Sequence, residues 1–269
     1  MTLTSGSKNH IILLKKGNFA PVVTTSQILM RRHPPQTLNG ADGHFGPKTE
    51  AAVSEFQKHH KLGVDGSIGN QTWRKLESLS RLKIIDVVDG TDPSLVNLEA
   101  NDIRAAGGDP IVVFGMSNGV AVVMGEIVAR AGGPNTVALL RIHGHGGKGI
   151  QNVTGGEING APHLAGISLT NFGQIAGSLM TIRHTFSPFG SVQLLGCKVG
   201  GGAAGRALVK KLADTWGVPV TAGVFDQLGG GANTFRFEGP TTTGYPSGTG
   251  LKGWSAEMEI AHGNVSVLT

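Results

Sequence analysis

Two short stretches of the sequence end in residues that can do nucleophilic chemistry. Val137–Gly149 is an apolar run that ends at His143 and His145, and residues 191–202 contain an apolar run that ends at Cys197, the single cysteine of the chain. A thiol attacks a carbonyl as its thiolate, and an imidazole can take up the proton and return it to a leaving amine. Glycines follow both runs and let backbone N–H groups approach a substrate. The pattern predicts a Cys/His hydrolase site.

Alternating strands and helices must position these side chains. Strand-like apolar runs and helix-like periodic runs follow one another from Ile111 onward, which predicts an α/β domain with a mainly parallel sheet flanked by helices. The expected strands are 111–114, 137–142, 192–195 and 218–222, with 83–88 as an earlier one, and the expected helices are 119–130, 169–184 and 203–216. Residues 234–239 and 253–262 are expected to be strands closing one edge. Since ligands bind beyond the carboxyl ends of parallel strands, His145 and Cys197 are expected to share one crevice.

Composition limits the function classes. The chain has 269 residues, enough for one large domain or two ordinary ones, and few charged or aromatic residues. A net charge of +5 and a pI of about 9.5 favour anionic polymers such as a bacterial wall. The basic residues are scattered, so no nucleic acid is expected as a partner. One cysteine excludes an internal disulfide, and no apolar run reaches membrane-spanning length.

The first eighty residues contain a repeated phrase. Asp42–Thr49, DGHFGPKT, recurs as Asp65–Thr72, DGSIGNQT, and each copy reads as an Asp-Gly turn followed by the start of a helix. Together with an earlier helix over 22–30, the pattern predicts a module of three short helices. The aspartates and glycines of the turns are expected to be structural. His44, His59 and His60 lack a third metal ligand at a recognisable spacing.

This first segment resembles the peptidoglycan-binding domain (type 1) that is joined to many wall hydrolases. The resemblance covers residues 14–79 and is carried by DGHFGPKTEAAVSEFQKHHKLGVDGSIGNQTWRKL. It implies peptidoglycan as a binding partner, without identifying the contact residues. The chain departs from the family at Arg31–Gln36, RRHPPQ, where a shorter turn is usual.

The second segment resembles the caspase, gingipain and legumain group of cysteine peptidases (clan CD). An apolar strand that ends in His-Gly and a later strand that ends in Gly-Cys carry the resemblance. It implies that His145 and Cys197 are catalytic, that the backbone N–H groups of Gly146 and Cys197 form the oxyanion hole, and that His143 is a neighbour in the substrate pocket. In that group the strand after the cysteine leads to the specificity pocket. Asp226 is therefore expected to pair with a cationic group of the substrate; a loop carboxylate that caps local N–H groups is the alternative.

Other interpretations of these residues remain. A lone cysteine can be a small buried hydrophobic residue, and His143, His145, His163 and His184 could hold zinc, although no H-E-x-x-H motif is present. Residues 144–149 match G-x-G-x-x-G, but IQNVTGGEINGAP follows where a dinucleotide site needs a helix. No cofactor or metal is expected.

The sequence thus predicts a two-domain, wall-directed cysteine hydrolase. Residues 1–80 would bind peptidoglycan, and residues 81–269 would form a caspase-like domain that cleaves an amide bond in a peptide stem or in a wall-associated protein. The start of the chain lacks the pattern of a signal peptide. Synthesis in the bacterial cytoplasm is then expected, with action at the wall after delivery by a contractile (type VI) secretion system or lysis. Such an antibacterial effector would have a cognate immunity protein. The alternative is a catalytically silent wall-binding or adaptor protein.

Overall fold

The computed structural model describes residues 12–90, 93–113, 119–153 and 166–263. Its N-terminal helical module (residues 21–80) consists of α1 (Pro21–Arg32), α2 (Pro47–His59) and α3 (Asn70–Ser80), as the sequence predicts. Prolines begin α1 and α2, where a missing N–H costs no hydrogen bond. Their apolar faces pack around Phe45, Phe56 and Trp73.

The two Asp-Gly turns are structural, and buried glutamines hold them. The Nε2 of Gln27 donates to Asp42 Oδ1 at 2.9 Å, and its Oε1 accepts from the N–H of Gly43. Gln57 repeats the arrangement, donating to Asp65 Oδ1 at 2.8 Å. Each aspartate thereby closes its turn around an amide that has no contact with water, which explains why the phrase recurs.

A six-stranded sheet forms the centre of the second part of the described chain, in the order β2-β1-β3-β7-β8-β9. Its strands are β1 (Lys83–Asp89), β2 (Ile111–Val113), β3 (Val137–His143), β7 (Phe186–Leu194), β8 (Val220–Gly223) and β9 (Thr241–Gly244). All neighbours are parallel except β8 and β9. This mainly parallel sheet confirms the predicted α/β class, while the caspase-like assignment remains a prediction.

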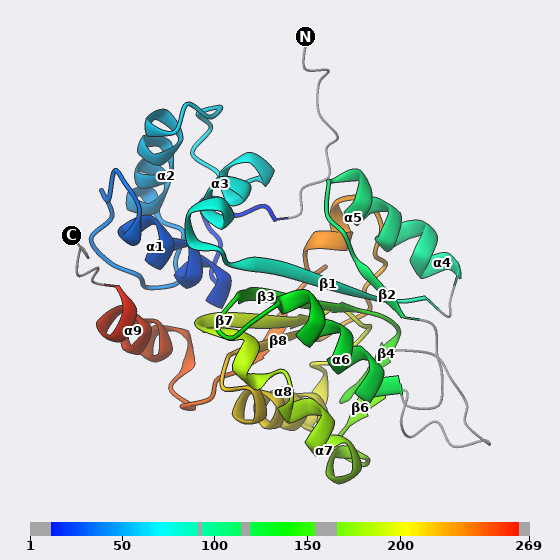
Figure 1. Ribbon diagram of the computed structural model, residues 1–269. Coiled ribbons are helices and arrows are strands. Elements are labelled where there is room, and N and C mark those ends of the chain that lie inside the picture. The colour runs from blue at the N-terminus through cyan, green and yellow to red at the C-terminus, as the bar shows by residue number, and fades with distance from the viewer. Residues whose placement is uncertain (1–11, 91–92, 114–118, 154–165, 264–269) are drawn as a thin grey trace.

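Helices cover both faces of the sheet (Figure 1). One face packs against α6 (Gly119–Ala131), α7 (Phe172–Met180) and α8 (Gly202–Trp216). The other face is covered by α1 and α9 (Gly250–His262) and, further along, by a run of short helices. These are α4 (Pro93–Leu95), the π-helix η1 (Val96–Ala100) and α5 (Asn101–Ala105). A small antiparallel sheet of β4 (Gly146–Gly147), β5 (Ile150–Asn152) and β6 (Gly166–Ser168) follows β3.

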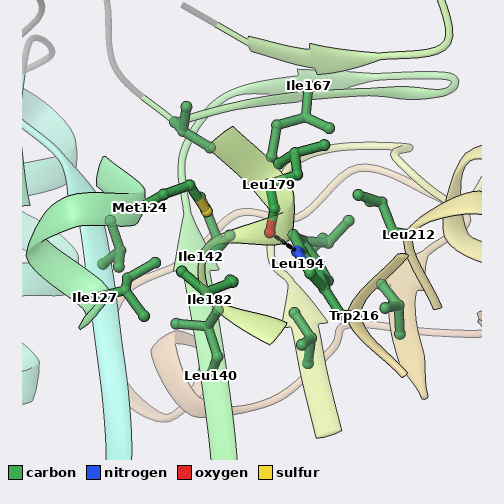
Figure 2. Close-up of a cluster of buried hydrophobic side chains, with 14 of the residues drawn as sticks. Met124, Ile127, Leu140, Ile142, Ile167, Leu179, Ile182, Leu194, Leu212 and Trp216 are labelled. Atoms are coloured by element: carbon green, nitrogen blue, oxygen red, sulfur yellow. Dashed lines mark hydrogen bonds between the residues drawn. The ribbon is translucent and has the colours of Figure 1, made fainter. Parts of the chain in front are cut away.

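The main core lies between the sheet and α6, α7 and α8. Figure 2 shows aliphatic side chains from both layers meeting around Trp216, whose indole N–H donates to the carbonyl of Leu179 at 2.9 Å. A second core joins the N-terminal helical module to the opposite face, because Leu139 and Phe189 of the sheet belong to the same cluster as Leu29 of α1. The module is thus packed onto the sheet instead of being joined to it by a free linker.

Several predicted elements differ from the structure. Residues 253–262 lie in the helix α9, because Ser255 and Met258 contact the module while the neighbouring Trp254 is buried. Residues 234–239 are not a strand: the 3-10 helix η4 (Gly231–Phe235) occupies their start, and β9 closes the edge. The helix predicted over 169–184 is shorter, since α7 ends at Met180 and the 3-10 helix η3 (Arg183–Thr185) precedes β7. The other predicted strands and helices are found within a few residues, although β7 begins earlier than predicted, at Phe186.

Candidate functional site

The loops that carry the predicted histidine and cysteine touch at one edge of the sheet. β3 and β7 are parallel neighbours, so Gly144–Gly146 and Gly196–Cys197 both follow carboxyl ends of strands. A Cβ added to Gly146 would lie 3.1 Å from the backbone N of Cys197 and 3.0 Å from its O. Only a residue without a side chain permits this approach. The expected meeting of the two loops is therefore present in the fold.

Exposure at the site differs between the two side chains. His145 is exposed and Cys197 is half-buried, so both can be reached from solvent. The Cys197 sulfur contacts the loop after β8: it lies 3.2 Å from the carbonyl oxygen of Gln227 and accepts from the N–H of Gln227 at 3.3 Å. The sulfur is thus held in position without being enclosed in aliphatic packing.

Two backbone N–H groups near the contact, those of Gly146 and Cys197, are the predicted oxyanion-hole donors. Asn152 N–H donates to the carbonyl of His145 at 2.9 Å, and Gly146 pairs with Gln151 at the next position of the antiparallel ladder. Because such ladders alternate, the N–H of Gly146 points away from β5. Within the described residues the N–H of Cys197 donates to no acceptor. Among the described residues neither N–H group has a backbone acceptor, and their role as oxyanion donors remains a prediction.

The turn after Cys197 is fixed by backbone hydrogen bonds to the end of β8 and to the loop that follows it. Lys198 adopts a left-handed conformation with φ of 59°. The N–H of Lys198 donates to the carbonyl of Phe225, and the N–H of Gly200 donates to the carbonyl of Gly223 at 2.8 Å. Helix α8 then begins at Gly202, five residues beyond the cysteine.

Asp226, the predicted partner of a substrate cation, pairs with a cation of its own chain. Its Oδ2 lies 2.8 Å from the Nζ of Lys198, and both side chains are largely exposed. The hydrogen bond and the charge of Asp226 raise the pKa of Lys198. A substrate amine would have to displace this lysine, which is possible because exposed ion pairs are weak.

His143, the predicted neighbour in the pocket, lies in the interior instead. Its side chain has no exposed surface, so it cannot touch a substrate in this conformation. Its Nε2 lies 3.2 Å from Asp86 Oδ1, and its Nδ1 lies 3.4 Å from Glu99 Oε2 without hydrogen-bond alignment. Arg141 binds the two oxygens of Asp86 at 2.6 and 2.9 Å. Asp86, Glu99, Arg141 and His143 form what we term the buried ion cluster.

The charges of the buried ion cluster shift its pKa values. Burial disfavours the charged imidazole of His143, but Asp86 and Glu99 outweigh burial and raise its pKa. Burial likewise opposes the charged form of Asp86, but Arg141 and His143 lower its pKa to about 2. The stabilisation from His143 is therefore complete below its ordinary pKa of 6.5 and is lost as the pH rises through the raised value. The stabilisation from Asp86 is present above pH 3.8 and is lost as the pH falls towards 2.

Comparison with known proteins identifies the N-terminal part. The model of the family "Putative peptidoglycan binding domain" matches residues 27–76. The chain carries a peptidoglycan-binding module. A domain of unknown function, DUF4347, matches residues 113–234, which include both candidate catalytic residues. That description names no activity, so the resemblance of this part to cysteine peptidases remains a prediction.

Curated relatives share only short segments with the chain. An N-acetylmuramoyl-L-alanine amidase, CwlL, from Bacillus licheniformis is 51% identical over 41 residues, which are 15% of this chain and 11% of that protein. An uncharacterized protein of Kitasatospora aureofaciens is 56% identical over 36 residues, or 13% of this chain and 30% of that one. The chain thus spans under a third of either relative, and the short likeness to an amidase supports association with the cell wall.

One solved structure shares sequence with part of the chain. It is a peptidoglycan-binding protein from Clostridioides difficile in complex with glutamine hydroxamate, 37% identical, with a TM-score of 0.24. The match covers 31% of this chain and 44% of that one. No helix among the described residues is long and apolar enough to cross a membrane. The same residues hold no group of three His, Cys, Asp or Glu that could bind a metal; His163 lies outside them.

The sequence analysis did not identify two features of the α/β part. Gln151 of β5 is buried, and its Oε1 accepts the N–H of Gly196 at 3.0 Å, which holds the cysteine turn against β5. Nothing in the sequence marks this glutamine. The buried ion cluster had a signal: Asp86 and Arg141 interrupt apolar strands, where an ionised side chain is rare without a partner.

Proposed function

We propose that the chain is a peptidoglycan-directed hydrolase in which Cys197 is the nucleophile and His145 the general base. The observation that carries this proposal is the contact between the His145–Gly146 loop and the Gly196–Cys197 turn, in a chain with a peptidoglycan-binding module. The exposure of His145 and the half-buried position of Cys197 support a role at the surface. The substrate is an amide bond in a peptide stem or in a wall-associated protein.

The proposed reaction has two halves. His145 takes the proton from the Cys197 sulfur, and the thiolate attacks the carbonyl carbon of the amide. The oxygen that becomes negative accepts hydrogen bonds from the N–H groups of Gly146 and Cys197. Protonated His145 gives its proton to the departing amine, which leaves a thioester on the sulfur. His145 then removes a proton from water, and the hydroxide releases the carboxylate product and regenerates the thiol.

Because the chain has a single cysteine, substitution of Cys197 tests the proposed nucleophile directly. Purified muropeptides are incubated with the protein, and the products are identified by mass spectrometry. We expect Cys197→Ser and His145→Ala to abolish cleavage, while His184→Ala, which alters another exposed histidine, leaves it unchanged. Alkylation should stop the reaction and a chelator should not, in contrast to a zinc amidase. Cleavage that survives Cys197→Ser refutes the proposal.

A catalytically silent wall-binding or adaptor protein is the second candidate. The contact of the Cys197 sulfur with the carbonyl of Gln227 favours it, because a thiol that donates to a carbonyl is in the neutral, unreactive form. This candidate predicts that the protein sediments with purified peptidoglycan and releases no fragment. It also predicts slow alkylation of Cys197 at neutral pH.

We also propose that the protein acts on the wall outside the cytoplasm, after specialised secretion or lysis, and that a cognate immunity protein neutralises it. The peptidoglycan-binding module supports action at the wall. In a test, the chain is expressed in a bacterium with and without a fused export signal. We expect lysis only after export and only with Cys197 intact. Equal toxicity of the exported Cys197→Ser variant contradicts this proposal.

A further inference from the structure

A cavity of about 580 Å³ lies between the peptidoglycan-binding module and the sheet, at the amino ends of β3 and β7. Both candidate catalytic residues follow the opposite, carboxyl ends of these strands. We term this cavity the seam cavity. It is lined by the end of α1, the end of α3, the start of β7 and the end of α9. Cavities of this size hold small organic ligands and occur often between domains. Its lining includes Arg32 and His33, which belong to the segment that departs from the family pattern.

Basic side chains line the seam cavity. Arg32, His33 and His262 all line it, and its lining contains no aspartate or glutamate. Burial lowers the pKa of Arg32, and burial together with the charge of Arg32 lowers the pKa of both histidines. Each charged form is thus disfavoured as the structure stands. A negative group in the cavity would offset these effects, because an opposite charge nearby favours the charged form of each side chain.

The helix ends explain why some of these basic side chains lie at the seam cavity, but they do not account for the unused donors of Arg32. Arg32 and His262 lie in the last turns of α1 and α9, where the helix dipole favours cations. The Nε of Arg32 donates to the carbonyl of His262 at 2.8 Å, and the guanidinium stacks on the Phe189 ring at 4.8 Å. The guanidinium of an arginine has five N–H donors, and this hydrogen bond uses only the one at Nε. Among the described residues, the terminal nitrogens of Arg32 have no hydrogen-bond acceptor. The N–H groups at this edge of the guanidinium therefore remain for a ligand.

We propose that the seam cavity binds a carboxylate attached to a small apolar group, as at the free end of a peptide. Arginine's fork fits the two oxygens of a carboxylate, and the half-buried surroundings strengthen such a bond. Leu29, Leu82 and Phe189 supply apolar surface beside it, and Ser187 and Asn135 supply polar groups. Such an end is present in wall peptide stems and in ordinary proteins. The site is independent of Cys197 and of any catalytic activity.

The test uses N-acetyl-alanyl-alanine in its L,L and D,D forms, the corresponding C-terminal amides, and inorganic phosphate. Binding to the Cys197→Ser protein is followed by NMR, using the side-chain Nε–H signal of Arg32 and the dissociation constant. For about fourteen non-hydrogen atoms we expect a dissociation constant on the order of 1 mM. The amides should bind at least about tenfold more weakly, since a charge-assisted hydrogen bond is lost. A preference for the D,D acid would indicate a wall stem, and equal binding a general peptide end.

Variants locate the ligand. Arg32→Gln should weaken binding of the acid about tenfold or more, and Arg32→Lys, which keeps the charge but not the fork, should weaken it less. Arg206→Gln, a change at an exposed arginine of α8, should have no effect. Because Arg32 also holds α9, the comparison of acid with amide in the parent protein gives an answer even where a variant fails to fold. Equal binding of acid and amide, an unmoved Arg32 signal, or tighter binding of phosphate overturns the proposal.

Discussion

Replacement of Gly146 by alanine tests the geometry of the candidate site most directly. The new Cβ would lie 2.6 Å from Cγ2 of Val199, as well as against the backbone of Cys197. Ordinary contact begins near 3.4 Å, so the two loops must separate by about 0.8 Å. Val199 is fully buried, so its side chain cannot turn towards solvent. Overpacking of this kind costs about 1–3 kcal/mol of stability.

The expected loss of activity is larger than that cost suggests. A displacement near 1 Å between reacting groups can lower the rate about a hundredfold, and one oxyanion donor is moved as well. The adjacent variant Gly147→Ala is the control, because a Cβ there meets no atom within 4 Å. Both variants are assayed for kcat/KM on muropeptides and for urea unfolding. If Gly146→Ala stays folded and cleaves as fast as Gly147→Ala, the two loops do not form one active site.

Three further changes test other parts of the structure. Gln151→Ala should cost about 1–3 kcal/mol in urea unfolding and should slow cleavage, because the buried N–H of Gly196 loses its acceptor; unchanged stability would remove its positioning role. Asp226→Ala should weaken only substrates that carry an amine, as seen in KM, and equal loss on all substrates would refute the specificity role. We expect the stability of the parent protein to fall above pH 6.5, and His143→Gln should remove this fall, as measured by urea unfolding at several pH values. A fall that persists in the variant would place its origin elsewhere.

Strand periodicity predicted much of the α/β part, and a general rule of parallel sheets predicted that the His145 and Cys197 loops lie together. The apolar run that ends at His143 and the run that ends before Cys197 could be placed as parallel neighbours without coordinates, because both are short, buried and separated by a helix. The contact of their loops then follows from the common direction of parallel strands. This rule does not predict how closely the two loops approach each other, because that distance depends on the absence of a side chain at Gly146.

The prediction failed where distant packing decides the structure. Residues 253–262 contain Trp254 and Met258 at helical spacing, yet the segment is short and follows a turn-rich stretch. Its helix is stabilised by the module at the other end of the chain, where Ser255 bonds Thr24 at 2.7 Å and Glu259 pairs with Arg31. No local pattern contains that information. His143 was misplaced for a related reason: its partner Glu99 comes from a π-helix whose position on the sheet the sequence does not show.

The packing of the module also restricts how it can assist cleavage. Figure 1 shows α1 and α3 near the amino ends of the strands, whereas the candidate site follows their carboxyl ends. β3 separates the two by seven residues, on the order of 20 Å at the rise of a strand. Because the module and the sheet share one core, this separation is fixed. Under the proposed function, a peptide stem bound near the ends of α1 and α3 would lie about one strand length from Cys197. The module would then act by raising the local concentration of neighbouring stems.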